Sequence, residues 1–474
     1  MYVNDKCKIK VGNNLSETIK TDKGVRQGCI LSPLLFNIFL ADLPLPLSNP
    51  THENPQIGTN KELSCILWAD DLVMFSKTED GLQNMIRKLS DYTKQNGLSI
   101  NTEKTKCMIF NKTGKFIRRN FNLENTKIET VRQYKYLGFI ITPSGEINSG
   151  LKDLKSRGIF ALTELRNKMG EYFNKYPDTT MHLFDALIKP IILYMADFWG
   201  CLPLQKYNPV DTTQNRFLKQ MLGVQTQTTT SGILLETGSV PLSLFAQKYC
   251  IKNWERIAIK KQSNILVQTS YTNSLEKGLL WTGKIKSCLS INGMQNLFSN
   301  NGQIEVHKVY FTRIVDIFHQ NSFADIRRED SKLRTYALIK TDTGIERYLN
   351  HIKNTKDRIM FTKFRLSNHN LMIEKGRHRN IDKSLRFCPF CPNIVEDEIH
   401  FLIKCKCTCY SAARDVLFKT VVEENKVPNF IYLETREQSN ILLTHPDIVQ
   451  HTAQYITKTM AIRDFLIAKH KNNA

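Results

Sequence analysis

Two adjacent acidic residues, Asp70 and Asp71, lie between two short apolar runs in the stretch 63–76. Each run is long enough for a buried strand, and a tight turn between two strands directs its central side chains outward at the tip. Magnesium accepts one or two such carboxylates together with phosphate oxygens of a substrate. The pattern therefore predicts either a magnesium site for phosphoryl transfer or an ordinary hairpin, since aspartate is also a common turn residue.

A second group of residues could hold a different metal. Cys388 and Cys391 are separated by two residues, and His400 follows after eight more. Two thiolates, an imidazole and a third thiolate form a closed tetrahedral Zn²⁺ site, which is structural because no coordination position stays open. The third thiolate has three candidates, and we favour the first because it closes the shortest loop: Cys405, Cys407 and Cys409. Unpaired cysteines beside an unrelated histidine are the alternative.

Composition favours a nucleic-acid partner. The chain has 474 residues, of which 41% are apolar, and Lys and Arg outnumber Asp and Glu by 21. This length allows two to four domains, and this charge attracts polyanions, with a membrane surface as the second candidate. No apolar run approaches roughly 18 residues, and the N-terminus has no signal-peptide core. We therefore expect a nuclear or cytoplasmic protein that is neither secreted nor inserted in a membrane.

The elements around the acidic pair can be read from the pattern. Gly24 and Gly28 form a pliable loop, after which Ser32 can cap a buried helix that has Pro33 in its first position. Apolar residues at helical spacing predict a core helix over 81–94. A strand follows near 104–110, and a strand pair near 134–141.

Three polar residues near these elements could serve chemistry. Arg26 and Gln27 stand beside Gly28, whose missing side chain lets a nucleotide or template base approach closely. Lys104 comes just before a strand, where it could protonate or neutralise a leaving pyrophosphate, or simply be solvated.

Beyond residue 150 the apolar period becomes helical, and a helix over 183–199 is expected to break or kink at Pro190. The stretch 351–387 carries ten Lys or Arg residues, Arg365 and Arg377 among them, against three acids. A solvated helix face usually mixes both signs of charge, so this bias predicts contacts with phosphates.

Four motifs follow one another in an order and at spacings that resemble the reverse transcriptase of non-LTR (LINE-type) retrotransposons. They are the segments 24–37, 69–71, 97–105 and 136–138. A further block, which runs from Arg365 through 374–377 and the cysteine group, resembles the Cys-Cys-His-Cys element at the C-terminus of the same family. The family usually has Phe or Tyr directly before Ala-Asp-Asp, whereas this chain has Trp68, which is also a flat aromatic residue.

The resemblance implies a palm of antiparallel strands and two helices, in which Asp70 binds catalytic Mg²⁺ beside Asp71. Gln27 and Gly28 would lie against the template or the incoming base pair. The primer grip would consist of Tyr136, Leu137 and Gly138.

One expected acid is missing. The family has another metal-binding aspartate upstream of the glycine loop, but only 23 residues precede Gly24 here, and their acids do not form that motif. Fingers and an endonuclease are missing as well. We therefore expect an N-terminally truncated enzyme that polymerises little or not at all as an isolated chain.

The sequence thus predicts an α+β fold with three parts: a partial palm at 1–145, an all-α thumb and connection at 146–350, and a basic region with a Zn²⁺ element and a helical tail at 351–474. The predicted activity is RNA-directed DNA synthesis on an RNA template and a target DNA, from deoxynucleotides and with Mg²⁺. A non-catalytic nucleic-acid-binding protein is the first alternative, and a protein like a group II intron maturase is the second.

Overall fold

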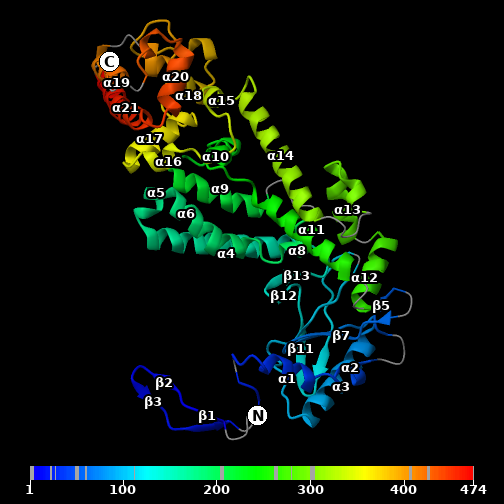
Figure 1. Cartoon of the computed structure of the whole chain (residues 1–474). Helices are drawn as coiled ribbons and strands as arrows, with labels where there is room; N and C mark the ends of the chain where they lie inside the picture. Colours follow the sequence, from blue (N-terminus) through cyan, green and yellow to red (C-terminus); the bar gives the residue numbers. More distant parts are fainter. Residues whose placement is uncertain are drawn as a thin grey trace. The chain divides into compact units, whose positions relative to one another are not determined.

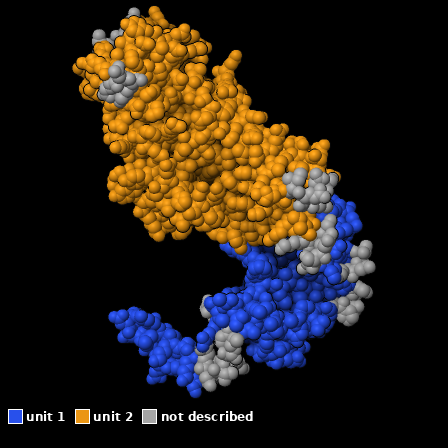
Figure 2. All heavy atoms as spheres, viewed as in Figure 1, with its two compact units in different colours: residues 1–146, 260–279 blue, residues 147–259, 280–474 orange. Residues whose placement is uncertain are grey.

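The computed structural model describes residues 5–21, 24–26, 28–48, 53–58, 61–111, 113–202, 208–260, 265–278, 280–298, 305–404, 408–423 and 427–472. These residues form two compact units, drawn in blue and orange in Figure 2. Unit 1 consists of residues 1–146 and 260–279, and unit 2 of residues 147–259 and 280–474. Helices and several small sheets together make the fold α+β, as predicted. The three-part division of the chain stays a prediction.

Unit 1 begins with short exposed strands and a short helix. The strands are β1 (Asp5–Cys7), β2 (Lys10–Val11), β3 (Asn14–Leu15) and β4 (Ile19–Thr21), in the pairs β1 with β4 and β2 with β3. Helix α1 (Ser32–Phe39) follows, then α2 (Pro44–Leu47). Ser32 is the first residue of α1 and its hydroxyl donates to the carbonyl oxygen of Arg26 at 2.7 Å, so the expected cap is absent.

Helix α1 is also not the buried helix that the sequence predicted. Leu34 is 57% exposed and Ile38 is 63% exposed. The helix has only eight residues, and Phe36 is its one residue that packs against the neighbouring core cluster. The apolar face is therefore wider than the surface that this unit offers to cover it.

The core of unit 1 is formed by a hairpin and one long helix. Strands β7 (Cys65–Trp68) and β8 (Asp71–Met74) pair in antiparallel fashion, and α3 (Glu79–Gln95) confirms the predicted core helix. The hydroxyl oxygen of Thr78 caps α3 by accepting a hydrogen bond from Gly81 N at 3.0 Å. The buried residues that join the hairpin to α3 are Leu40, Leu43, Leu47, Met85 and Tyr92.

Smaller sheets complete this unit. Strands β10 (Phe121–Leu123), β11 (Thr126–Thr130) and β9 (Lys106–Cys107) form a sheet in that order, in which β11 and β9 are parallel. The predicted strand pair near 134–141 is confirmed as β12 (Tyr134–Tyr136) and β13 (Phe139–Ile141). The last elements are β5 (Gln56–Ile57), β6 (Lys61–Glu62) and α12 (Ile265–Glu276).

Unit 2 is almost entirely helical. Its α-helices are α4 (Asn148–Met169), α5 (Tyr172–Lys175), α6 (Pro177–Leu183), α7 (Lys189–Ile192), α8 (Ala196–Trp199), α9 (Pro209–Leu222), α10 (Thr230–Glu236), α11 (Leu242–Lys260), α13 (Leu280–Ile291), α14 (Val306–Arg327), α15 (Tyr336–Ile339), α16 (Tyr348–His351), α17 (Thr355–Arg365), α18 (Met372–His378), α19 (Thr408–Glu423), α20 (Thr435–Thr444) and α21 (Val449–Asn472). Short 3₁₀ segments occur at Gln295–Phe298, Lys383–Leu385 and Phe430–Tyr432.

Two helix pairs organise unit 2. Helices α4 and α9 lie side by side (Figure 1), and α17 packs against α21. The expected break at Pro190 occurs as a π-helical turn, Phe184–Ile188, directly before α7, because proline cannot donate the hydrogen bond that would continue an α-helix. Among the described residues, no helix is both long and apolar enough to cross a bilayer.

Candidate functional site

The acidic pair lies at a two-residue hairpin turn. Trp68 pairs with Asp71, which leaves Ala69 and Asp70 as the loop between β7 and β8. Ala69 has a φ of +52°, a left-handed conformation that costs a residue with a Cβ about 1 kcal/mol. The tight connection fixes where the two carboxylates leave the backbone.

The hairpin turns one face toward the core and the other away from it. Leu67 and Leu72 are paired with each other and pack against the α3 cluster. Since side chains alternate along a strand, the neighbouring pair of Trp68 and Asp71 lies on the opposite face. Trp68 is 66% exposed, and Asp70 and Asp71 are exposed as well. Both carboxylates are therefore accessible to a cation and a substrate.

A second hairpin contains the predicted primer-grip residues. Tyr136 pairs with Phe139, so Leu137 and Gly138 form a two-residue loop, and both have positive φ, +45° and +79°. This is the backbone pattern of a type I′ hairpin turn, in which glycine is favoured. Burial raises the pKa of Tyr136, and the negative charge of Asp71 raises it further. The Tyr136 phenol of the predicted primer grip therefore lies within electrostatic range of Asp71.

Lys104 is connected to that second hairpin through its backbone. The hydroxyl of Tyr134 donates to the carbonyl oxygen of Lys104 at 3.3 Å. The backbone N–H of Lys104 donates to Oδ1 of Asn101 at 3.0 Å, which holds the turn before β9. The Lys104 side chain is exposed. Within the described residues it makes no ion pair with Asp70 or Asp71, so its predicted role stays a prediction.

The structure describes two of the three residues that were predicted to act in the glycine loop. Arg26 is exposed, and its carbonyl oxygen holds Ser32 as described above. Gly28 has a φ of +82° and open space where a side chain would begin. Its conformation and its surroundings suit close approach of another molecule. Gln27 lies outside the residues that the structure describes.

The predicted Zn²⁺ ligands come together as far as the structure describes them. Three residues each place one ligand atom within 4.8 Å of the other two: Cys388, Cys391 and His400. All three residues are buried. Neither ring nitrogen of His400 has a hydrogen-bond partner among the residues that the structure describes. A buried imidazole without a partner is costly, and a metal bound by one of its nitrogens would remove part of that cost.

Local backbone contacts position these three residues. A β-bridge joins Phe387 to Val395, and Cys388 N donates to the carbonyl oxygen of Ile394 at 2.8 Å, so the two cysteines lie in one closed turn. His400 begins a π-helical segment, His400–Lys404, and its N–H donates to Oδ1 of Asp397 at 2.7 Å. Cys405 and Cys407 lie outside the described residues, as does the side chain of Cys409.

Arg365 does not lie where the sequence placed it. We predicted a contact with nucleic acid, but the side chain is fully buried. Its Nε contacts Oε1 of Glu236 at 2.8 Å, and its Nη2 contacts Oε2 of Glu346 at 2.7 Å. Although burial opposes the charge, these carboxylates raise the pKa of Arg365. The residue therefore stabilises the helical core, and its assignment to nucleic acid is wrong.

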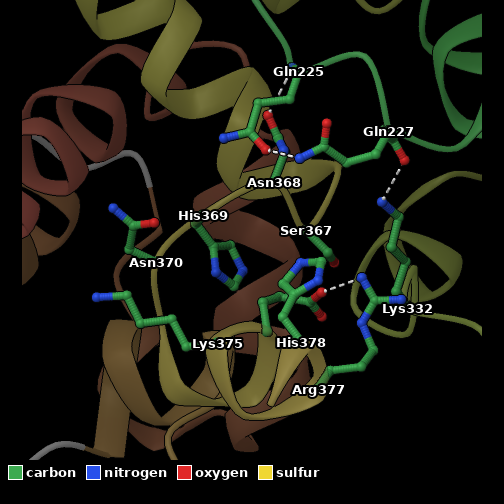
Figure 3. A pocket seen from close by; sticks show the side chains of 11 residues that line it. Gln225, Gln227, Lys332, Ser367, Asn368, His369, Asn370, Lys375, Arg377 and His378 are labelled. Carbon is green, nitrogen blue, oxygen red and sulfur yellow. Dashed lines mark hydrogen bonds and ion pairs between the residues drawn. The ribbon is translucent and has the colours of Figure 1, made fainter. Parts of the chain in front are cut away.

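Arg377, by contrast, is exposed at the end of α18 and forms a 3.0 Å ion pair with Glu374. It lines a cavity of about 270 Å³ together with Lys332 and Gln225 (Figure 3). Sequence analysis missed these two residues. They come from separate connections of unit 2, and no local pattern marks either of them.

Comparison with known proteins shows which proteins the first part of the chain resembles. Residues 1–141 match the family described as "Reverse transcriptase (RNA-dependent DNA polymerase)". This segment contains the glycine loop, the acidic hairpin, Lys104 and the second hairpin.

The similar proteins found by comparison are all named for mobile genetic elements. Over 218 residues the chain is 26% identical to "Probable RNA-directed DNA polymerase from transposon BS" of Drosophila melanogaster. The aligned segment covers 44% of this chain and 23% of that protein. Over 156 residues it is 29% identical to "Retrovirus-related Pol polyprotein from type-1 retrotransposable element R2" of Nasonia vitripennis, covering 31% of this chain and 15% of that one. Over 211 residues it is 22% identical to "RNA-directed DNA polymerase from mobile element jockey" of Drosophila funebris, covering 43% and 22%.

These matches confirm the predicted relationship to the reverse transcriptases of non-LTR retrotransposons. The chain spans less than a quarter of the length of these relatives.

Proposed function

We propose that this chain takes part in RNA-directed DNA synthesis by a non-LTR retrotransposon, with Asp70 as its metal-binding carboxylate and Asp71 as the catalytic residue beside it. The observation that carries the proposal is the exposed acidic pair at the β7–β8 turn. The donor set suits Mg²⁺, which takes one or two protein carboxylates and completes its shell with phosphate oxygens and water. Bound Mg²⁺ would lower the pKa of a primer 3′-hydroxyl and balance charge on the leaving pyrophosphate.

The neighbouring residues would then hold the substrates. The hairpin around Leu137 and Gly138 would position the primer end, and the exposed loop at Arg26 and Gly28 would contact the template or the incoming base pair. Lys104 would neutralise charge on the pyrophosphate. The substrates are a deoxynucleotide, an RNA template and a target DNA.

We further propose that the 474-residue chain alone extends primers little or not at all. A two-metal site needs carboxylates from more than one position, and among the described residues no third acid, cysteine or histidine groups with Asp70 and Asp71. The missing carboxylate would come from another segment or another chain.

Primer extension on an RNA template with Mg²⁺ tests both proposals. We expect at most trace extension by the purified chain, and loss of any trace in Asp70→Asn. Efficient template-dependent extension would contradict the proposed incompleteness, and extension that survives Asp70→Asn would contradict the assignment of the acidic pair.

A second readout does not depend on turnover. Fe²⁺ occupies Mg²⁺ sites and, with a reductant and peroxide, cleaves the backbone nearby. We expect cleavage close to the β7–β8 turn, suppressed by excess Mg²⁺ and absent in Asp70→Asn. Asp80→Asn, which alters another exposed acid outside the turn, is the control and should cleave as the parent does.

We propose a structural Zn²⁺ site at Cys388, Cys391 and His400, with Cys405 as the fourth ligand. Two observations support it: the proximity of the three described ligand atoms, and an imidazole that has no partner in the described part of the chain. The metal would supply a fixed crosslink between the cysteine turn and the segment that begins at His400.

A non-catalytic nucleic-acid-binding protein is the second candidate function. The excess of 21 basic residues and the basic cavity of unit 2 favour it. RNA binding without any Fe²⁺ cleavage at the acidic turn would select this function. The relatives described above are all named for transposable elements, so the intron-maturase alternative gains no support from them.

A further inference from the structure

Three connections and one helix of unit 2 enclose the cavity of about 270 Å³ shown in Figure 3. One wall comes from the segment between α9 and α10, one from the segment before α15, and the rest from the α17–α18 connection and α18 itself. The lining residues that matter here are Gln225, Lys332, Asn368, Lys375, Arg377 and His378.

Direct contacts fix the walls of this cavity. Gln225 N donates to Oδ1 of Asn368 at 3.1 Å, and Nζ of Lys332 donates to the carbonyl oxygen of Gln227 at 3.3 Å. These bonds join segments that lie more than a hundred residues apart in the sequence. The cavity is therefore held by the fold of unit 2. The Asn368 amide uses its oxygen for this bond, and within the described residues its NH₂ group donates no hydrogen bond.

The acids at the cavity already have cationic partners. Glu374 contacts Arg334 and Arg377, each at 3.0 Å, and Glu398 behind it contacts Arg334 at 2.6 Å. Lys332 and Lys375 add two further positive charges to the lining. The cavity thus carries more positive charge than its own carboxylates balance.

This excess has an electrostatic cost. Burial lowers the pKa of Lys332, and the positive charges of Arg377 and Lys219 lower it further, against an opposing contribution from Glu374. Burial also lowers the pKa of Lys375. Partly dehydrated cations that repel one another gain most from a bound anion, because it pairs with several of them at once.

We propose that this cavity binds a phosphate group of a nucleic-acid strand, with Lys332 and Arg377 as the charged contacts and the Asn368 amide as a hydrogen-bond donor. The proposal rests on the proposed function in one respect, since it takes nucleic acid as the partner. It adds a defined phosphate site in unit 2, separate from the acidic hairpin of unit 1.

Salt-dependent binding of a labelled single-stranded RNA tests the proposal. Each phosphate contact on a single strand contributes roughly 0.7 to the slope of log affinity against log salt. We expect Lys332→Gln/Arg377→Gln to bind about 10-fold more weakly and, because one phosphate contact is lost, to reduce that slope by about 0.7. The fold should survive because Glu374 keeps Arg334. The single variant Lys332→Gln, which leaves both ion pairs of Glu374 intact, provides a second measurement.

A charge-matched control separates the cavity from general charge loss. Lys308→Gln/Lys419→Gln removes the same formal charge from two exposed lysines that pair with Glu305 and Glu423. We expect its affinity and slope to stay close to those of the parent. A cavity variant that behaves like this control would overturn the proposal.

Two further outcomes are decisive. If the parent chain binds no nucleic acid, both this proposal and the proposed partner fail, whereas RNA binding with an unchanged slope in the cavity variant refutes the cavity alone. Inorganic phosphate is titrated in parallel at constant ionic strength. If it raises the melting temperature of the parent and not of the cavity variant while both bind RNA equally, the ligand is a free phosphate and the nucleic-acid assignment is overturned.

Discussion

Burial decides what each charged residue of this chain does, and the sequence shows charge but not burial. Of the ten cations in 351–387, Arg358 and Arg365 are buried, and each serves the interior. Arg358 donates to backbone carbonyl oxygens, among them that of Ile352 at 3.2 Å. The partner of Arg365, Glu236, lies 129 residues earlier, so no local pattern could reveal it. Counting charges therefore overstated the phosphate-binding capacity of this stretch.

Removal of the Arg365 charge should destabilise unit 2 strongly. Arg365→Met leaves the buried Glu236 carboxylate without its cationic partner, and breaking a buried ion pair in this way costs about 3 to 5 kcal/mol. The double variant Glu236→Gln/Arg365→Met should recover part of the loss. Urea unfolding measures both. Equal stability of parent and Arg365→Met, or a loss of RNA affinity in the folded variant, would contradict the structural role.

The Tyr92 hydroxyl should give unit 1 a component of stability that depends on alkaline pH. It donates to Oδ1 of Asp42 at 2.6 Å, and burial together with the Asp42 carboxylate raises the pKa of Tyr92 to about 12. Because the folded pKa lies above the ordinary value of 10.0, this contribution is complete below pH 10.0 and is lost as the pH rises through about 12. Tyr92→Phe should show a flatter decline in unfolding free energy over this range, whereas parallel curves would refute the assignment.

Among the helices and strands, the sequence predicted those whose formation depends on a short-range pattern of residues. The segment 134–141 predicted the strand pair near Tyr136, and helical spacing predicted α3. The failures concern exposure. The apolar spacing of α1 fixes a helix with one hydrophobic face, but whether Leu34 and Ile38 are covered depends on which surfaces lie nearby. The left-handed backbone of Ala69 was also invisible, since alanine rarely marks such a position.

The cysteine and histidine segment should hold one metal ion. Cys388→Ser removes a thiolate from the group of three and should lower the zinc content of purified protein from about one per chain to well below that. Chelation should lower the melting temperature of the parent more than that of the variant. Cys7→Ser, which alters an exposed cysteine outside the group, is the control and should keep its zinc. Unchanged zinc in Cys388→Ser would refute the site.

For the whole molecule, the sequence identified the kind of protein better than its spatial organisation. The four palm motifs lie within the matched segment 1–141, and their order alone indicated the family. Unit 1 nevertheless also contains residues 260–279, which include α12. A helix that joins a unit from a distant part of the chain leaves no periodic signal, so a division by sequence position could not include it.

The net charge of the whole chain makes a final prediction about its affinity for RNA. With 21 more basic than acidic residues, binding should depend mainly on displacement of counterions from phosphates. At four or more phosphate contacts, the slope of log affinity against log salt for a single strand is about −3 or steeper, so affinity falls roughly 50-fold between about 50 and 200 mM salt. Fluorescence anisotropy over this range measures the slope. A peptide nucleic acid of the same base sequence lacks the phosphates and should not bind, and equal binding of the two strands would show that the charge of this chain does not direct its partner.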